Sequence, residues 1–123
     1  MRILLIEDME SDAELIRMEL LDEWPALQLD WVNGRQPLMQ ALANPAPDLV
    51  LCDSRLPGSL HGSELHALVK RAWPDVPFAF CVGAVDDPAL QPLLAQAEAV
   101  VDKNHLQALV PTIKRVMATP RPD

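Results

Sequence analysis

The chain has 123 residues and a mass of 13.6 kDa, the size of one domain with its own hydrophobic core. Half of its residues are hydrophobic and 23% are charged, a balance that excludes an intrinsically disordered chain. The formal net charge is −8, so we expect neither nucleic acid nor an anionic membrane surface as a direct partner.

The apolar segments are too short for a membrane protein. The longest, residues 76–85, falls well below the roughly 20 residues that cross a bilayer. Glu7 and Asp8 interrupt the N-terminal apolar segment, which therefore lacks the core of a signal peptide. Cys52 and Cys81 lie in apolar runs, where free, buried thiols are expected. Together these features favour a cytoplasmic protein.

Short apolar runs alternate with segments of helical periodicity. In chain order, we expect strands at residues 3–6, 27–32, 49–52, 78–82 and 99–101, the second of them near a sheet edge. Apolar side chains at helical spacing predict helices around residues 15–21, 38–42, 65–73, 90–94 and 106–116. Ser11 or Asp12 is the expected N-cap of the first helix, and Pro92 predicts a short or irregular fourth helix.

Strand and helix thus repeat five times. This order predicts an α/β domain whose parallel sheet is covered by helices on both faces. We expect the domain to span residues 1–117, and the Pro-rich residues 118–123 to form a tail or a linker stub. Ligands bind such sheets at the carboxyl ends of the strands, so the residues that follow each apolar run are the functional candidates.

Acidic residues and one lysine occupy most of these positions. They are Glu7 and Asp8, Asp53, Gly83, and Asp102 with Lys103. Crowded carboxylates repel one another unless a cation relieves them, and hard oxygen ligands suit Mg²⁺. One carboxylate could attack a phosphoryl donor and form an acyl phosphate, while a metal and a lysine neutralise the transferred charge. Each residue alone is more often a turn, cap or surface residue, but the combination predicts phosphoryl chemistry.

The sequence resembles the receiver domain of two-component response regulators over nearly its whole length. Residues 3–8 (ILLIED) resemble that family's first strand and acidic pair, and residues 47–53 (PDLVLCD) resemble the strand that leads to its phosphoacceptor. Residues 56–58 (LPG) resemble the loop that follows, residues 76–78 (VPF) the fourth strand, and Lys103 the lysine of the fifth strand. The resemblance implies a flavodoxin-like (βα)5 three-layer sandwich with a parallel five-stranded sheet in the order 2-1-3-4-5.

The resemblance also implies a metal site. Asp53 would be the phosphoacceptor and a ligand of Mg²⁺ or Mn²⁺. Asp8 would bind the ion directly, Glu7 directly or through water, and the backbone carbonyl of Arg55 would add a further ligand.

Other residues would hold the phosphoryl group. Lys103 and the backbone N–H of Gly83 would contact its oxygens, and residues 57–58 would shape the loop around it. The side chain of Arg55 has two interpretations: a contact to the phosphoryl group or to attacking water, or a solvent-facing loop arginine.

Two switch positions depart from the family pattern. Receivers carry Ser or Thr at the end of the fourth strand and an aromatic residue on the fifth, where this chain has Val82 and Val100. The chain has no Tyr, and residues 64–111 contain neither Ser nor Thr. A valine side chain donates no hydrogen bond. A hydrogen bond to a charged group contributes about 1.5–3 kcal/mol. We therefore expect the domain to accept a phosphoryl group but to change its conformation less on phosphorylation than other receivers do.

Two functions are compatible with these residues. The first is a phosphorylatable receiver, which takes phosphate from a histidine kinase or phosphotransfer protein and signals to an output domain or partner. The alternative is a pseudo-receiver, an interaction module with little dependence on phosphate. Asp8, Asp53 and Lys103 favour the first, whereas Val82 and Val100 favour the second.

We expect no enzyme that turns over an external substrate. An aspartate-nucleophile phosphatase needs a second acid two residues after a nucleophile on the first strand, and Met9 and Glu10 follow Asp8. A glycine-rich turn for a dinucleotide is also missing after that strand. In receivers, the fourth helix, fifth strand and fifth helix form the usual output and dimer surface, so a homodimer through this face is a further expectation.

The histidines and tryptophans carry weaker signals. His61, His66 and His105 share no metal-ligand spacing and are expected on the surface or on helices. The three tryptophans are expected to cover edges of the core. They are Trp24, Trp31 and Trp73.

Overall fold

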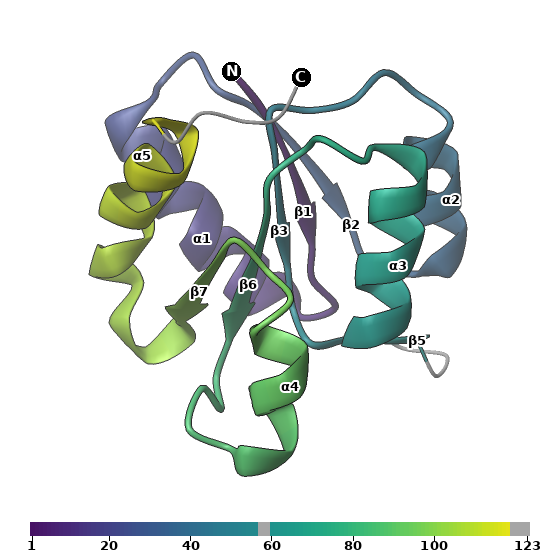
Figure 1. The fold of residues 1–123 in the computed structure, drawn as a ribbon. Coiled ribbons are helices and arrows are strands. Elements are labelled where there is room, and N and C mark those ends of the chain that lie inside the picture. Colours follow the sequence, from purple (N-terminus) through teal and green to yellow (C-terminus); the bar gives the residue numbers. More distant parts are fainter. Residues whose placement is uncertain (57–59, 119–123) are drawn as a thin grey trace.

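The computed structural model describes residues 1–56 and 60–118, which form an α/β sandwich around one parallel sheet (Figure 1). The strands, in spatial order, are β2 (Gln28–Val32), β1 (Arg2–Ile6), β3 (Leu49–Cys52), β6 (Phe78–Val82) and β7 (Ala99–Asp102). Numbered among themselves in chain order, these strands follow 2-1-3-4-5. The flavodoxin-like fold expected from the sequence is therefore confirmed.

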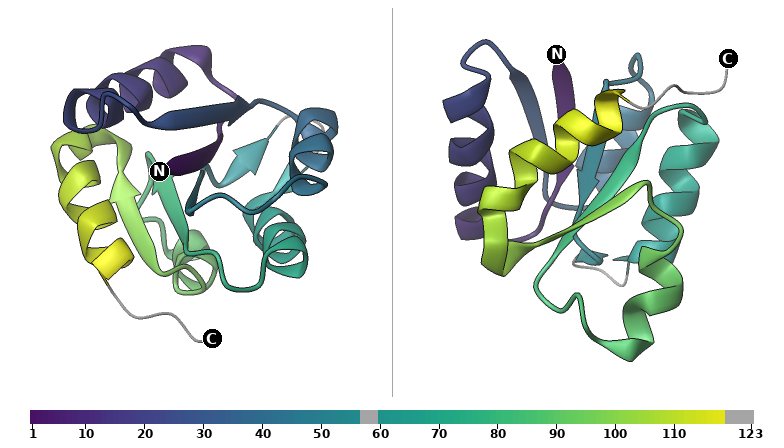
Figure 2. Two further views of the ribbon diagram at one scale, coloured as in Figure 1. Left: turned by 90° about the horizontal axis from the view of Figure 1, so that it is seen from above. Right: turned by 60° about the vertical axis from the view of Figure 1, so that its left-hand side comes forward.

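Helices cover both faces of the sheet (Figures 1 and 2). The helices α1 (Glu10–Glu23) and α5 (Leu109–Ala118) pack on one face. On the other face lie α2 (Arg35–Leu42), α3 (Gly62–Ala72) and α4 (Gln91–Leu94). Short 3-10 segments, Pro88–Leu90 and Lys103–Ala108, lead into α4 and α5.

The central strands are buried on both faces, which explains their unbroken apolar runs. Along β1, Leu4 and Ile6 face the α2–α3–α4 side, whereas Ile3 and Leu5 face α1 and α5. Only Val32 of β2 is buried, as expected for an edge strand. Both cysteines are free and buried, as predicted.

Some local predictions differ from the structure. The N-cap of α1 is Met9, without a side-chain hydrogen bond, so the predicted cap at Ser11 or Asp12 is wrong. The reason lies in the fold, since the Asp12 carboxylate bonds to Lys103 instead of to the helix N-terminus. The fourth helix is short, as Pro92 predicted. A small antiparallel pair, β4 (Arg55–Leu56) and β5 (Leu60–His61), was not expected.

Within the described ranges, no helix combines the length and the apolar character needed to span a bilayer.

Candidate functional site

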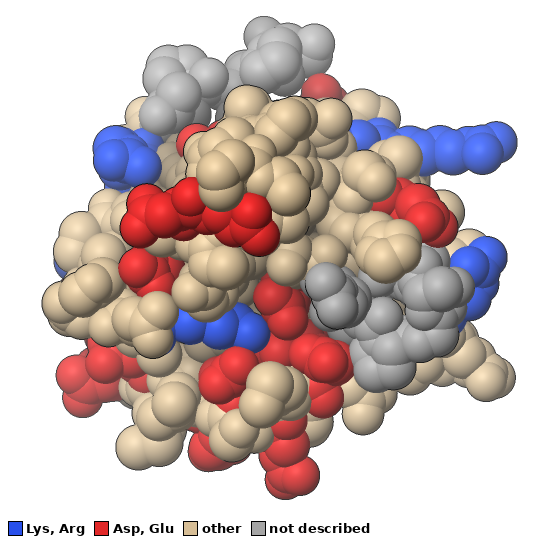
Figure 3. All heavy atoms as spheres, turned by 90° about the horizontal axis from the view of Figure 1, so that it is seen from below, with Lys and Arg blue, Asp and Glu red and all other residues tan. Residues whose placement is uncertain are grey.

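The candidate site lies where the parallel strands end, at the lower edge of the sheet in Figure 1. Figure 3 looks onto this end of the molecule and shows acidic side chains gathered over it, with basic side chains among and around them. Glu7 and Asp8 follow β1, Asp53 follows β3, and Lys103 follows β7. The topology therefore brings together residues that are far apart in the sequence.

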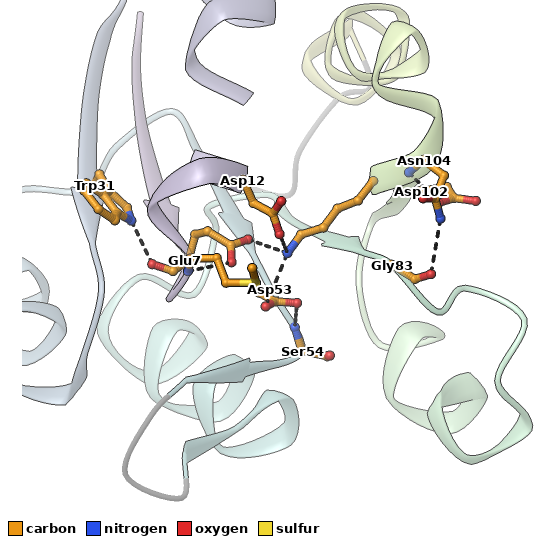
Figure 4. A network of polar contacts seen from close by, with 10 residues as sticks. Glu7, Asp12, Trp31, Asp53, Ser54, Gly83, Asp102 and Asn104 are labelled. Atoms are coloured by element: carbon orange, nitrogen blue, oxygen red, sulfur yellow. Dashed lines mark hydrogen bonds and ion pairs between the residues drawn. The ribbon is translucent and has the colours of Figure 1, made fainter. Parts of the chain in front are cut away.

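Lys103 is the centre of the site, because it pairs with Glu7, Asp12 and Asp53, the three acids that Figure 4 labels. Its Nζ lies 2.7 Å from Oε2 of Glu7, 2.9 Å from Oδ2 of Asp12 and 3.4 Å from Oδ2 of Asp53. The lysine side chain is only 14% exposed, so these interactions are poorly screened by solvent. One ammonium group thus pairs with three carboxylates, one after β1, one in α1 and one after β3.

Glu7 is held more tightly than the other acids, and its side chain is 0% exposed. Its backbone N–H donates to the Val32 carbonyl at 3.1 Å, and its own carbonyl accepts the Trp31 indole N–H at 2.7 Å. Oε1 accepts the Met9 N–H at 3.2 Å. Oε2 has the ion pair with Lys103 but no hydrogen bond of good geometry from the described residues. This buried oxygen can therefore accept a further ligand.

Glu7, Asp8 and Asp53 form a set of oxygen ligands suited to a cation. Each offers a carboxylate oxygen, and these atoms lie within 4.8 Å of one another. Asp8 is exposed, whereas Asp53 is half-buried and its Oδ1 accepts the Ser54 N–H at 2.7 Å. Three carboxylate oxygens with an open, solvent-facing side match the preference of Mg²⁺. The residues present therefore fit the metal that the sequence resemblance implied.

Burial and mutual repulsion disfavour ionisation of the acids. Burial raises the pKa of Glu7 to about 7, although the contact with Lys103 opposes the shift. Burial also raises the pKa of Asp53, again against the attraction of Lys103. For Lys103 itself burial lowers the pKa, but Glu7, Asp12 and Asp53 outweigh it and the net pKa is raised. The lysine therefore stays charged.

Asp12 was missed as a site residue. It lies in the first turn of α1, so it is not among the residues that directly follow a strand. It follows Asp8 by only four residues, and this short separation along the chain is the signal that could have placed the two acids near each other.

Asp102 is outside the cluster, although it precedes Lys103. Its Oδ1 accepts the backbone N–H of Asn104 at 2.8 Å and the side-chain amide of Asn104 at 3.0 Å. Asp102 therefore caps the following 3-10 segment. The Asn104 amide also reaches the Gly83 carbonyl at 3.4 Å, which links the ends of β6 and β7 (Figure 4).

The two predicted switch positions lie on neighbouring strands, Val82 at the end of β6 and Val100 opposite Phe80 within β7. Val82 is buried in the core at the end of β6, while Val100 on β7 is 36% exposed. Val100 helps to line an open groove of about 490 Å³. The other lining residues are Val85, Gln91, Leu94, Ala95 and Asp102. A valine thus occupies the place beside α4 where the sequence pattern expects an aromatic ring.

The remaining candidates have different outcomes. Residues 57–58 and the side chain of Arg55 lie outside the described part of the chain, although the Arg55 backbone belongs to β4. His61 and His105 are exposed. His66 is half-buried on α3, with its ring edge-on to Phe78 at 4.9 Å. Across the described residues, the acidic set is the only group of three or more candidate metal ligands.

Comparisons with known proteins point to one fold family. No protein-family model matches the sequence. Among solved structures, the non-phosphorylated HemR receiver domain from Leptospira biflexa is 28% identical, with a TM-score of 0.74. The match covers 99% of this chain and 98% of that chain.

Two further structures are more distant in sequence. The response regulator TrrA from Thermotoga maritima, solved in complex with Mg²⁺-BeF, is 22% identical with a TM-score of 0.78, over 94% of this chain and 97% of that chain. The N-terminal domain of a response regulator/sensory box/GGDEF 3-domain protein from Carboxydothermus hydrogenoformans is 19% identical with a TM-score of 0.79. This match covers 95% of this chain and 94% of that chain. The chain therefore has the fold of response regulator receiver domains, as its sequence resemblance implied.

Proposed function

We propose that this chain is a phosphoacceptor receiver domain of a two-component or phosphorelay system. Asp53 takes a phosphoryl group from a histidine kinase or phosphotransfer protein, and the domain signals to an output domain or protein partner. The observation that carries the proposal is the contact of Lys103 with Glu7, Asp12 and Asp53 at the carboxyl edge of the sheet. The domain catalyses only its own phosphorylation and dephosphorylation.

The chain's own residues account for the main steps. The Ser54 N–H fixes one oxygen of Asp53 and leaves Oδ2 beside the lysine. Oδ2 attacks the phosphorus, the bond to the donor's nitrogen breaks, and the leaving imidazole takes a proton. Lys103 and the Gly83 N–H bind the charged phosphoryl oxygens. Lysine thereby stabilises charge that develops during transfer.

Glu7, Asp8, Asp53 and the Arg55 carbonyl would hold the metal ion. Mg²⁺ or Mn²⁺ in this place supplies positive charge next to the transferred group. The buried Oε2 of Glu7, whose one described partner is Lys103, and the spacing of the three carboxylates support this assignment.

Mass spectrometry of the intact protein tests the proposal. After incubation with Mg²⁺ and acetyl phosphate, we expect one added phosphoryl group, which is lost without Mg²⁺ and in Asp53→Asn. Asp48→Asn, which removes an acid just before β3, is the control and should be labelled normally. Labelling that persists in Asp53→Asn, or no labelling together with no Mg²⁺ binding, would contradict the proposal.

The pseudo-receiver remains the second candidate because of Val82 and Val100. The exposed valine at position 100 supports it, since no aromatic ring is present there to act as a switch. Phosphorylation that leaves partner binding unchanged would favour this function over the first.

Val82→Thr should strengthen the coupling between the site and α4. With Mg²⁺ and beryllofluoride as a stand-in for phosphate, amide shifts of the wild type should stay near Asp53. The added hydroxyl contributes one hydrogen bond to a charged group, so the shifts in Val82→Thr should extend into β7 and α4. Val101→Thr, buried on the opposite face of the sheet, is the control. Equal responses of wild type and Val82→Thr would refute a role for the missing hydroxyl.

Further assignments belong to the same proposal. The receiver spans residues 1–117, acts in the cytoplasm and binds no nucleic acid or membrane itself. A homodimer through α4, β7 and α5 is its proposed self-association. Light scattering before and after phosphorylation tests the dimer.

A further inference from the structure

Trp31 makes an unexpected contact with the site from the edge strand β2. Its indole N–H donates to the backbone carbonyl of Glu7 at 2.7 Å (Figure 4). Glu7 lies one residue beyond β1, where the strand ladder ends. The next residue of β2, Val32, accepts the Glu7 N–H at 3.1 Å. Two adjacent residues of β2 therefore hold both backbone polar groups of the buried site acid.

Packing alone does not explain the position of this indole. Trp31 is 41% exposed and lines an open groove of about 250 Å³ between α1 and β2. A core tryptophan such as Trp73 is fixed on nearly all sides and is 7% exposed. The orientation of Trp31 thus depends on its short hydrogen bond to Glu7, and that bond reaches the turn that carries two of the three candidate metal ligands.

We propose that Trp31 is a positioning residue for the cation site. The indole N–H fixes the Glu7 carbonyl, and the fixed backbone sets the direction of the Glu7 and Asp8 carboxylates toward Asp53. The inference rests on the proposed function, since it concerns the metal that the receiver chemistry uses. Trp31 itself touches neither the metal nor the phosphoryl group.

Two matched variants separate positioning from packing. Trp31→Phe keeps an aromatic ring and removes the donor to Glu7. Trp73→Phe makes the same change at the other end of the sheet, where the indole N–H donates to the Asn44 carbonyl at 3.2 Å. Each variant loses one ring nitrogen and one hydrogen bond to a main-chain carbonyl. Trp31→Leu, which also has no donor in its side chain, serves as the test if Trp31→Phe does not fold.

Calorimetric titration with Mg²⁺ gives the main result. Trp31→Phe should bind Mg²⁺ roughly fivefold more weakly than wild type, the effect of one hydrogen bond. Trp73→Phe should stay within about twofold of wild type, since distant sites act independently. In the wild-type NMR spectrum, the indole N–H resonance that disappears in Trp31→Phe should shift on Mg²⁺ addition, and that of Trp73 should not.

The outcomes separate the two proposals. Equal Mg²⁺ affinity of wild type and Trp31→Phe overturns the positioning role and leaves the proposed function standing. An equal loss in both variants also overturns it, because the effect is then one of general stability. A wild type that binds no Mg²⁺ overturns both.

Discussion

Lys103→Met should abolish phosphorylation and lower the free energy of unfolding by about 3 kcal/mol at pH 8. Methionine keeps much of the length of the side chain but removes the charge. Glu7, Asp12 and Asp53 then lose the ammonium group with which all three pair. Breaking a buried ion pair destabilises strongly because the partner charge stays buried, and Glu7 is the partner with no exposed surface.

The loss should depend on pH. At pH 5, Glu7 is mainly protonated because its pKa is raised to about 7, and Lys103 then faces less negative charge. The difference between wild type and Lys103→Met should therefore be smaller at pH 5 than at pH 8. Urea unfolding at both pH values measures it.

Lys114→Met is the matched control for this variant. Lys114 pairs with Glu23 on the surface, and both residues are exposed. Such surface pairs contribute about 0–1 kcal/mol. Lys114→Met should be phosphorylated like wild type and nearly as stable. Phosphorylation of Lys103→Met at the wild-type rate would show that the lysine does not assist transfer.

Much of the fold could be predicted because its cause is local in the sequence. Strands buried on both faces need continuous apolar runs, and helices with one buried face need apolar residues at helical spacing. The pair β4 and β5 has two residues in each strand, too few for any pattern to show. The start of α1 was misplaced because its polar residue, Asp12, is used by tertiary structure.

The site could be predicted in part, for a topological reason. Glu7, Asp8, Asp53 and Lys103 follow strands directly, and parallel strands end at one edge. The same rule selects Asp102, which turns away to cap the next segment. Contacts that depend on the length and direction of a side chain cannot be predicted from the position of a residue in the sequence alone.

The contacts of Asp12 and Trp31 were not predicted because they depend on the reach and direction of a side chain. Asp12 reaches Lys103 from a helix, and Trp31 reaches Glu7 from the edge strand. Trp31 was expected only to cover the core, and the structure shows a partly exposed ring with a hydrogen bond to the site.

Glu7→Gln should stabilise the protein at pH 8 and not at pH 4. The pKa of Glu7 is raised by burial from its usual 4.5 to about 7 in the folded protein. Below pH 4.5 the acid is protonated in both the folded and unfolded states. Between pH 4.5 and about 7 the unfolded chain loses this proton first, so its free energy falls relative to the folded state. Wild-type stability should therefore decrease as the pH rises through this window.

The expected gain follows from the size of that shift. The interval from 4.5 to about 7 corresponds to at most about 3 kcal/mol, and because glutamine also needs hydrogen-bond partners we expect a gain of about 1–2 kcal/mol at pH 8. Urea unfolding across pH 4–8 measures it. Glu19→Gln, an exposed acid of α1, changes the net charge equally and should follow wild type.

Mg²⁺ should make wild type more stable than Glu7→Gln, the reverse of their order without the ion. A ligand that binds only the folded state stabilises it according to its concentration and affinity. Wild type at pH 8 should gain stability with rising Mg²⁺, and Glu7→Gln should gain much less because one carboxylate of the site is gone. The buried charge of Glu7 therefore destabilises the metal-free fold, and the same charge stabilises the metal-bound protein. A wild-type stability that is constant from pH 4.5 to 7 would contradict the predicted cost of the Glu7 charge. Equal gains in stability from Mg²⁺ in both proteins would contradict its role as a metal ligand.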